Sequence, residues 1–150
     1  VLPQGPAAVT GRIEAGDWLL AVDGHPVDAR TNLDELLEHK IGRQVLLTVA
    51  GSPDGAGSRE VALKPVDQRT EKGLTYRAWV EDNRAYVERE STGRLGYVHM
   101  YDMGDASLAQ LFLDLDTQNK TKDGVVVDVR NNNGGYVNAY ALDVLSMTHP

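Results

Sequence analysis

The fold of the second half of this chain is decided by one stretch, Gly124-Val125-Val126-Val127-Asp128-Val129-Arg130-Asn131-Asn132-Asn133-Gly134-Gly135. Its three consecutive valines are β-branched and apolar on both faces, which is typical of a strand that is covered on both sides. The polar, glycine-rich run after the valines predicts a turn. Apolar residues then recur at helical spacing and predict a helix from Tyr136 onwards: Val137, Tyr140, Ala141, Val144 and Leu145. A strand, a turn and a helix in this order form the part of an α/β enzyme where catalytic groups collect.

The predicted turn is suited to binding negative charge. Asn132, Asn133, Gly134 and Gly135 can adopt left-handed backbone dihedral angles, which leave N–H groups pointing into open space. The N-terminus of the following helix would add its partial positive charge. We expect the turn to stabilise an oxyanion or a phosphate, and a plain connection between strand and helix is the alternative. Nucleotide binding is a minor alternative, because the Gly-Lys-Ser/Thr sequence and the spacing of a dinucleotide fingerprint are both absent.

Upstream of this stretch, helices and strands alternate. Aromatic and apolar residues at helical spacing predict a surface helix over about residues 74–90, and an apolar run predicts a strand over 95–101. Asp105 is expected to cap a second helix, whose apolar stripe consists of Leu108, Leu111, Phe112 and Leu115. Strand, helix, strand and helix in this order indicate parallel strands with a right-handed crossover.

The first half has the alternation of an antiparallel sheet. Apolar residues alternate from Trp18 to Val22, and Asp23-Gly24 supplies a tight hairpin turn. Thr31 is expected to cap a helix that Gly42 closes. Two further strands are predicted on either side of a loop over residues 52–58: Val45, Leu47 and Val49 before it, and Val61 and Leu63 after it.

Composition limits the partners of the chain. A net charge of −7 argues against nucleic acid, because phosphate contacts need clustered lysine and arginine, and it disfavours a membrane surface for the same reason. No apolar run has the length of a membrane span. The absence of cysteine excludes disulfides and a thiolate nucleophile, and it fits a reducing, cytoplasmic location. The histidines lack metal-ligand spacing, so we expect neither a metal nor a cofactor.

Two motifs in the first half carry a family resemblance: Gly5-Pro6-Ala7-Ala8, and the run from Gly11 to Gly24, which includes Gly16-Asp17 and ends in Asp23-Gly24. Together they resemble the core of bacterial PDZ domains over residues 1–66. The resemblance implies that the predicted helix flanks a peptide groove. Its peptide-binding residues would be Asn32, Leu33, Leu36, Leu37 and Lys40. The carboxylate-binding loop of such a domain would precede Val1.

Three motifs in the second half carry another resemblance. They are the helical run from Tyr76 to Val87, the segment Gly96-Tyr97-Val98-His99-Met100 followed after one residue by Asp102-Met103, and Val127-Asp128-Val129-Arg130 with Gly134-Gly135. In this order they resemble the tricorn proteases, of the C-terminal processing group of serine peptidases, over residues 74–146. The resemblance implies a serine endopeptidase acting on peptides, in which Gly135, and second Gly134, supplies an oxyanion-hole N–H. It also implies a ring-forming homo-oligomeric parent.

The same resemblance places the nucleophilic serine after Pro150 and its histidine partner before Val1, so this chain itself is expected to be inactive. The serines within the chain lie in a loop and at helix ends, not in a strained turn after a strand. His99 is predicted to be a hydrogen-bonded structural histidine. Asp128 and Arg130 share one strand face, which predicts an ion pair or a contact with a neighbouring segment.

The combined prediction is an α+β chain of two domains. Residues 1–66 would form a PDZ-like, partly open β-barrel or sandwich with a flanking helix. Residues 67–150 would form an incomplete α/β segment with βαβα order and parallel strands, the truncated start of a catalytic core. The alternative is a non-enzymatic module that binds protein C-termini, and a phosphate-ligand site at residues 131–135 is a third possibility.

Overall fold

The chain forms two compact units, Val1–Ala78 and Trp79–Pro150, in a computed structural model that describes residues 1–119 and 121–146. The units meet within a long helix, α3 (Gln68–Glu90). The domain boundary predicted between residues 66 and 67 follows the sequence pattern and stays a prediction.

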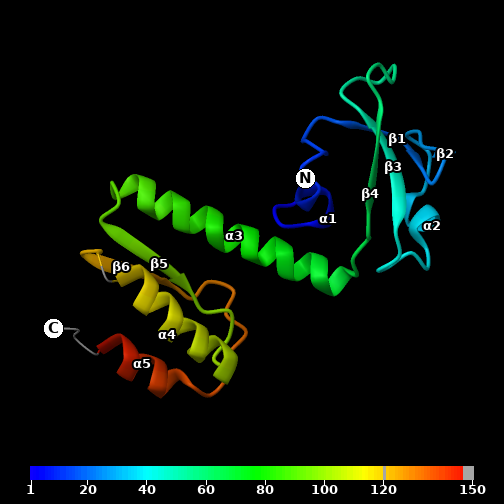
Figure 1. Cartoon of the computed structure of the whole chain (residues 1–150). Helices are drawn as coiled ribbons and strands as arrows, with labels where there is room; N and C mark the ends of the chain where they lie inside the picture. Colours follow the sequence, from blue (N-terminus) through cyan, green and yellow to red (C-terminus); the bar gives the residue numbers. More distant parts are fainter. Residues whose placement is uncertain (120, 147–150) are drawn as a thin grey trace. The chain divides into compact units, whose positions relative to one another are not determined.

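The first unit is built on a four-stranded antiparallel sheet (Figure 1), as the alternation predicted. Its strands are arranged in the order β2-β1-β3-β4. Their bounds are β1 (Trp18–Val22), β2 (His25–Pro26), β3 (Val45–Ala50) and β4 (Arg59–Leu63). The β1–β2 hairpin turns at Asp23 and Gly24, whose φ angles of 48° and 78° suit the right-handed twist of the strands. The apolar side chains buried in this unit are Val22, Val45, Val49, Ala50 and Val61.

Two short helices accompany this sheet, α1 (Pro6–Val9) and α2 (Leu33–Leu37). The cap predicted for α2 is wrong by one residue. Asn32, not Thr31, accepts the Asp34 N–H, because the Thr31 hydroxyl is engaged with the Asp28 carboxylate at 2.9 Å. The predicted end is also wrong: the backbone leaves the helical region at Glu38, well before Gly42.

Helix α3 is confirmed and begins earlier than its predicted start at residue 74. The Asp67 carboxylate accepts the N–H of Thr70 at 2.8 Å, which satisfies one of the free donors of the first turn. The first turn carries no apolar residue from which a periodicity could be read. At the other end, Gly93 has a φ of +78° and donates its N–H to the Glu88 carbonyl, as helix-terminating glycines do.

The second unit contains the predicted βαβα order. Strands β5 (Leu95–His99) and β6 (Gly124–Asp128) are parallel, with Leu95 opposite Gly124 and His99 opposite Asp128. Helix α4 (Asp105–Asn119) connects the two strands, and α5 (Asn138–Ser146) follows the turn after β6 (Figure 1). The buried core cluster of this unit consists of Val98, Met100, Leu111, Leu115, Ala141 and Val144.

The valine strand is less covered than predicted. Val125 and Val127 pack against the core cluster, whereas Val126 points to the opposite face and is 38% exposed. Phe112 likewise lies outside the apolar stripe of α4, and Tyr140 and Leu145 lie outside the buried face of α5. On β6, α4 and α5, apolar side chains therefore lie on the exposed side as well as in the core, so the apolar surface of each element is larger than the part that is packed.

Candidate functional site

The turn between β6 and α5 has an unusual backbone, as its composition predicted, but not at all the predicted residues. Asn131, Gly134 and Gly135 have positive φ angles of 56°, 76° and 143°. Asn132 and Asn133 do not, which corrects the expectation for these two residues. Their side chains are used for hydrogen bonds instead.

The turn is hydrogen-bonded to the segment that follows β5. The Asn133 N–H and its Nδ2 both donate to the Tyr101 carbonyl, at 3.0 and 3.2 Å. The Met103 N–H donates to the Gly134 carbonyl at 2.8 Å. The Met103 carbonyl accepts from both Tyr136 and Val137, at 2.9 and 3.0 Å. The turn is therefore held by main-chain bonds and not only by its own sequence.

The two glycine amides differ in their hydrogen bonding. The Gly134 N–H donates to Oδ1 of Asn132 at 2.8 Å. Gly135 forms a parallel bridge with Met103 in which the neighbouring Gly134 carbonyl and Tyr136 N–H make the bonds. The Gly135 N–H and the Gly134 carbonyl belong to one trans peptide group and point in opposite directions, so the N–H of Gly135 points away from Met103. Within residues 1–119 and 121–146 no acceptor is bonded to that N–H, and Gly135 is exposed.

Only glycine fits at position 135. A Cβ atom there would overlap the carbonyl group of Met103, whereas a Cβ at Gly134 would meet no atom within 4 Å. The close approach of Met103 thus requires the missing side chain at Gly135. The requirement at Gly134 is one of backbone angle alone.

Polar groups at the end of β6 form the predicted ion pair. Nε of Arg130 lies 3.0 and 2.9 Å from the two oxygens of Asp128, and the Tyr97 hydroxyl donates to Asp128 at 2.7 Å. The bonds from Arg130, and after them the one from Tyr97, hold the pKa of the Asp128 carboxyl well below its usual range. Burial, together with the adjacent Asp128 carboxylate, raises the pKa of Tyr97. The Asp128 carboxylate is therefore charged, and both its oxygens accept hydrogen bonds from Tyr97 or Arg130, so its role is structural.

His99 is the hydrogen-bonded histidine that the sequence predicted. Its Nε2 lies 2.9 Å from the carbonyl oxygen of Arg130, and its ring meets the edge of the Trp79 ring at 4.8 Å between centroids. The guanidinium of Arg130 lies over the same Trp79 ring. These contacts hold His99, the last residue of β5, against Arg130, which lies between β6 and the glycine turn.

The serine hydroxyls that could be mistaken for nucleophiles are occupied locally. The Ser107 hydroxyl donates to Asp102 at 2.6 Å, and the same carboxylate oxygen accepts the Gly104 N–H. Asp105, predicted as the cap, is the first residue of α4, and Asp102 holds the residue before the helix through the Gly104 N–H. The bonds from Ser107 and Gly104 lower the pKa of Asp102. The hydroxyls of Ser52, Ser91 and Ser146 also donate to groups within three residues.

The five residues predicted to bind peptide lie in and around α2. Asn32 uses its side chain to cap the helix and to contact Glu35, and Lys40 forms a 2.9 Å ion pair with Asp23. Leu33 is 38% exposed, and Leu36 and Leu37 are half-buried. The polar members of the set thus support the unit itself, and its leucines form the apolar part of the predicted surface.

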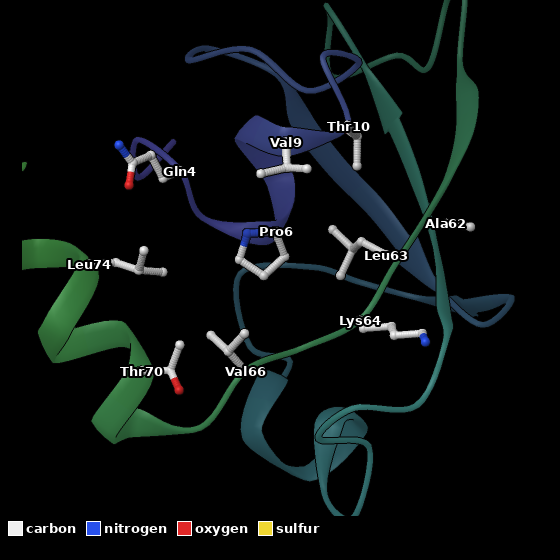
Figure 2. Close-up of a pocket in the computed structure, with 10 residues that line it drawn as sticks. All are labelled: Gln4, Pro6, Val9, Thr10, Ala62, Leu63, Lys64, Val66, Thr70 and Leu74. Atoms are coloured by element: carbon white, nitrogen blue, oxygen red, sulfur yellow. The ribbon is translucent and has the colours of Figure 1, made fainter.

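A cavity of about 450 Å³ lies elsewhere in the first unit (Figure 2). Its wall comes from α1, β4 and the start of α3, and includes Pro6, Leu63, Val66 and Leu74. None of the five predicted peptide-binding residues belongs to this wall.

The described residues contain no helix with the length and hydropathy of a membrane span. In the same part of the chain, no three His, Asp or Glu side chains gather in a way that could hold a metal ion.

Sequence reasoning named Asn132 and Met103 but missed the role of each in the site. Asn132 decides the bonding of Gly134, and Met103 holds the turn from a distant part of the chain. The role of the asparagine could have been found from its position two residues before a glycine, where its side chain reaches the backbone N–H. No local signal could have shown the role of Met103, because its main-chain groups are brought to the turn by the fold.

Comparisons with known proteins match both units. Residues 1–51 match the PDZ domain family, and residues 94–149 match peptidase family S41. The tricorn protease homolog 1 of Streptomyces coelicolor is 41% identical over 145 residues, which make up 95% of this chain and 13% of that protein. The tricorn protease of Thermoplasma volcanium is 33% identical over 134 residues, 89% of this chain and 12% of that protein.

A solved structure gives a similar result. The crystal structure of the tricorn protease matches with a TM-score of 0.76 and 29% sequence identity. The match covers 91% of this chain and 13% of the solved one. This chain therefore spans a small part of the length of each protein that it resembles.

Proposed function

Because this chain is related to the tricorn proteases over nearly its whole length, as its motifs predicted, we propose that it supplies the PDZ module and the oxyanion-binding turn of a serine peptidase. In such a reaction a serine oxygen attacks the carbonyl carbon of a peptide bond. The carbonyl oxygen becomes negatively charged, and an N–H donor aimed at it stabilises the transition state. The serine and its base would come from other parts of the whole protein.

One observation carries this proposal. Of the two glycine amides of the turn, the Gly135 N–H belongs to an exposed residue and is bonded to no described acceptor, while the Gly134 N–H donates to Asn132. An unpaired N–H beside a helix N-terminus is the arrangement that binds an oxyanion. One such donor contributes roughly 2.7–4 kcal/mol to catalysis. Gly135 is accordingly the first candidate donor and Gly134 the second.

Replacing the Gly135 amide by an ester tests the proposal in the whole peptidase. Glycolic acid at position 135 removes the N–H and keeps the backbone angles that a glycine allows. We expect kcat for a peptide substrate to fall by about 10²–10³ with little change in KM. Glycolic acid at position 134 removes the second candidate donor, and it should lower kcat less than the ester at position 135 does. Equal kcat values for the two esters and the unmodified enzyme would contradict the proposal.

The second proposed contribution is peptide binding by the surface of α2, through Asn32, Leu33, Leu36, Leu37 and Lys40. The exposed Leu33 and half-buried Leu36 and Leu37 support it, because apolar side chains beside a groove select peptide side chains. Titration of the chain with peptides carrying free C-termini should shift the NMR signals of residues 32–40. No shift at saturating peptide would remove this contribution.

Location and assembly complete the proposal. The chain has no cysteine, which supports a cytoplasmic peptidase, and the resemblance to tricorn proteases supports peptide substrates and a homo-oligomeric whole protein. We place the module boundary between residues 66 and 67, where the strand alternation ends and the helical pattern begins.

A further inference from the structure

We infer that Asn132 is the positioning residue that leaves Gly135, and not Gly134, as the free glycine amide of the turn in the described structure, an inference that rests on the proposed function. Its side chain forms two bonds in opposite directions. Oδ1 accepts the Gly134 N–H at 2.8 Å, and Nδ2 donates to the Met100 carbonyl at 2.9 Å. The amide group therefore joins the turn to the end of β5.

The first bond selects between the two glycines. Two adjacent amides in a left-handed turn can both turn towards one anion, because glycine has no Cβ to oppose either orientation. Here Asn132 holds the N–H of Gly134 by its own side chain. The Gly135 N–H then faces away from Met103 without a bonded acceptor among the described residues. Of the two glycine amides, the one at Gly135 is then the free donor in the described structure.

The second bond, from Nδ2 of Asn132 to the Met100 carbonyl, fixes the position of the turn relative to β5. The Met100 carbonyl belongs to a residue that is 1% exposed in the core of the unit, so Asn132 is anchored to the rigid part of the fold. Met103 then holds Gly134 and Tyr136 on either side of Gly135. The orientation of the free N–H is thus set from both sides, by the side chain of Asn132 and by the main chain of Met103. Preorganised donors stabilise developing charge without reorganising during the reaction.

Asn133 offers a matched control. Its Nδ2 donates to the Tyr101 carbonyl at 3.2 Å, so it also joins the turn to the segment after β5. Its side chain does not contact either glycine amide in the described structure, and its backbone N–H keeps the bond to Tyr101 when the side chain is removed. Removing Asn133 therefore loosens the same connection without releasing Gly134.

The structural part is tested on the chain itself by NMR hydrogen exchange. In the unmodified chain we expect the Gly134 amide to be protected and the Gly135 amide to exchange rapidly. Asn132→Ala should remove the protection at Gly134, and Asn133→Ala should leave it. Asn132→Ser retains an oxygen that can accept the same N–H and should keep part of the protection. Loss of protection at Gly134 in Asn133→Ala, or its retention in Asn132→Ala, would overturn the inference.

The functional part is a double-substitution cycle in the whole peptidase. Asn132→Ala should lower kcat at least about tenfold with KM nearly unchanged, because a donor misplaced by 1 Å can cost ~10²-fold. Asn132→Ser should recover part of this loss, and Asn133→Ala should stay close to the unmodified enzyme. In the enzyme that carries the ester at position 135, Asn132→Ala should have little further effect, since the donor it orients is gone.

The outcomes separate the two proposals. If the ester at position 135 leaves kcat unchanged, the proposed function fails. If that ester lowers kcat but Asn132→Ala does not, Asn132 does not act through Gly135 and the inference fails. The inference also fails if the fold-loss in kcat of the doubly changed enzyme equals the product of the two single fold-losses. Hydrogen exchange on the folded chain decides the structural part even if a variant peptidase is poorly expressed.

Discussion

At the scale of single residues, the two adjacent glycines of the turn have different reasons to be glycine. Gly134 has a φ of 76° with open space around it, whereas Gly135 has a φ of 143° with the Met103 carbonyl where a Cβ would lie. The first needs only a backbone angle, and the second needs both the angle and the absence of a side chain.

This difference predicts unequal effects on stability. Gly134→Ala should lower the free energy of unfolding by ~1–2 kcal/mol, the cost of a left-handed angle. Gly135→Ala should lower it by about 3 kcal/mol or more, because the backbone of Met103 must also move. Urea unfolding followed by Trp79 fluorescence, in a Trp18→Phe background, reports the second unit. Equal losses would show that the overlap with Met103 is relieved at no cost.

A second prediction at this scale concerns pH. The pKa of Asp128 is lowered from the ordinary value of 3.8, mainly by its bonds to Arg130, so its charged form favours folding. The stabilisation is present above about pH 4 and is lost as the pH falls below it, because the unfolded chain then binds the proton first. Asp128→Asn should be ~1–3 kcal/mol less stable at pH 7 and should lose less stability between pH 4 and pH 2. Unfolding midpoints at a series of pH values measure both effects. Equal pH slopes for the two proteins would show that other carboxylates are responsible.

At the scale of the elements, the spacing of apolar residues and the identity of the turn residues predicted the strands and the order of the helices. The alternation around Trp18–Val22 and the Asp23-Gly24 turn were sufficient for the hairpin, because both signals are local. The ends of α2 and the start of α3 were missed for other reasons. Thr31 and Asn32 are both able to cap a helix, and the choice was made by Asp28, which engages the threonine hydroxyl. The first turn of α3 had no apolar residue to reveal it.

The cap of α2 gives a prediction for this scale. Asn32→Ala should destabilise the first unit by ~1 kcal/mol, because the Asp34 N–H loses its acceptor. Thr31→Ala removes the contact with Asp28 and leaves that cap in place, so it should cost less. Amide exchange of Asp34 in the two variants distinguishes the cases. Faster exchange in Thr31→Ala than in Asn32→Ala would restore threonine as the cap.

At the scale of the whole molecule, sequence and structure agree on the kind of protein but each supplies a different part of the site. The motifs predicted the glycine turn and the similarity to tricorn proteases that the comparisons found. They did not show which glycine amide stays unpaired, because that depends on the local bond from Asn132 and on Met103, which meets the turn only after β5, α4 and β6 have folded together.

The reactivity of the whole chain is the last prediction. Serine hydroxyls in the described residues lie in loops, turns and helix ends, and Ser52, Ser91, Ser107 and Ser146 are bonded to nearby groups, while Ser58 is exposed in the loop before β4. A fluorophosphonate probe should therefore leave the 150-residue chain unlabelled while labelling an active serine hydrolase in the same mixture. Intact-mass analysis detects the adduct. Labelling of the chain would place a nucleophile within it and overturn the proposed division of the site.

The double hydrogen bond at the Met103 carbonyl has one further consequence. Because this oxygen binds the first two amides beyond Gly135, the loop between β5 and α4 and the start of α5 must shift together. Substitutions in that loop, about thirty residues upstream in sequence, would then alter turnover by tilting a peptide plane of the turn. Slow variants selected at random in such a peptidase should accordingly cluster in residues 100–104 as well as in the glycine turn.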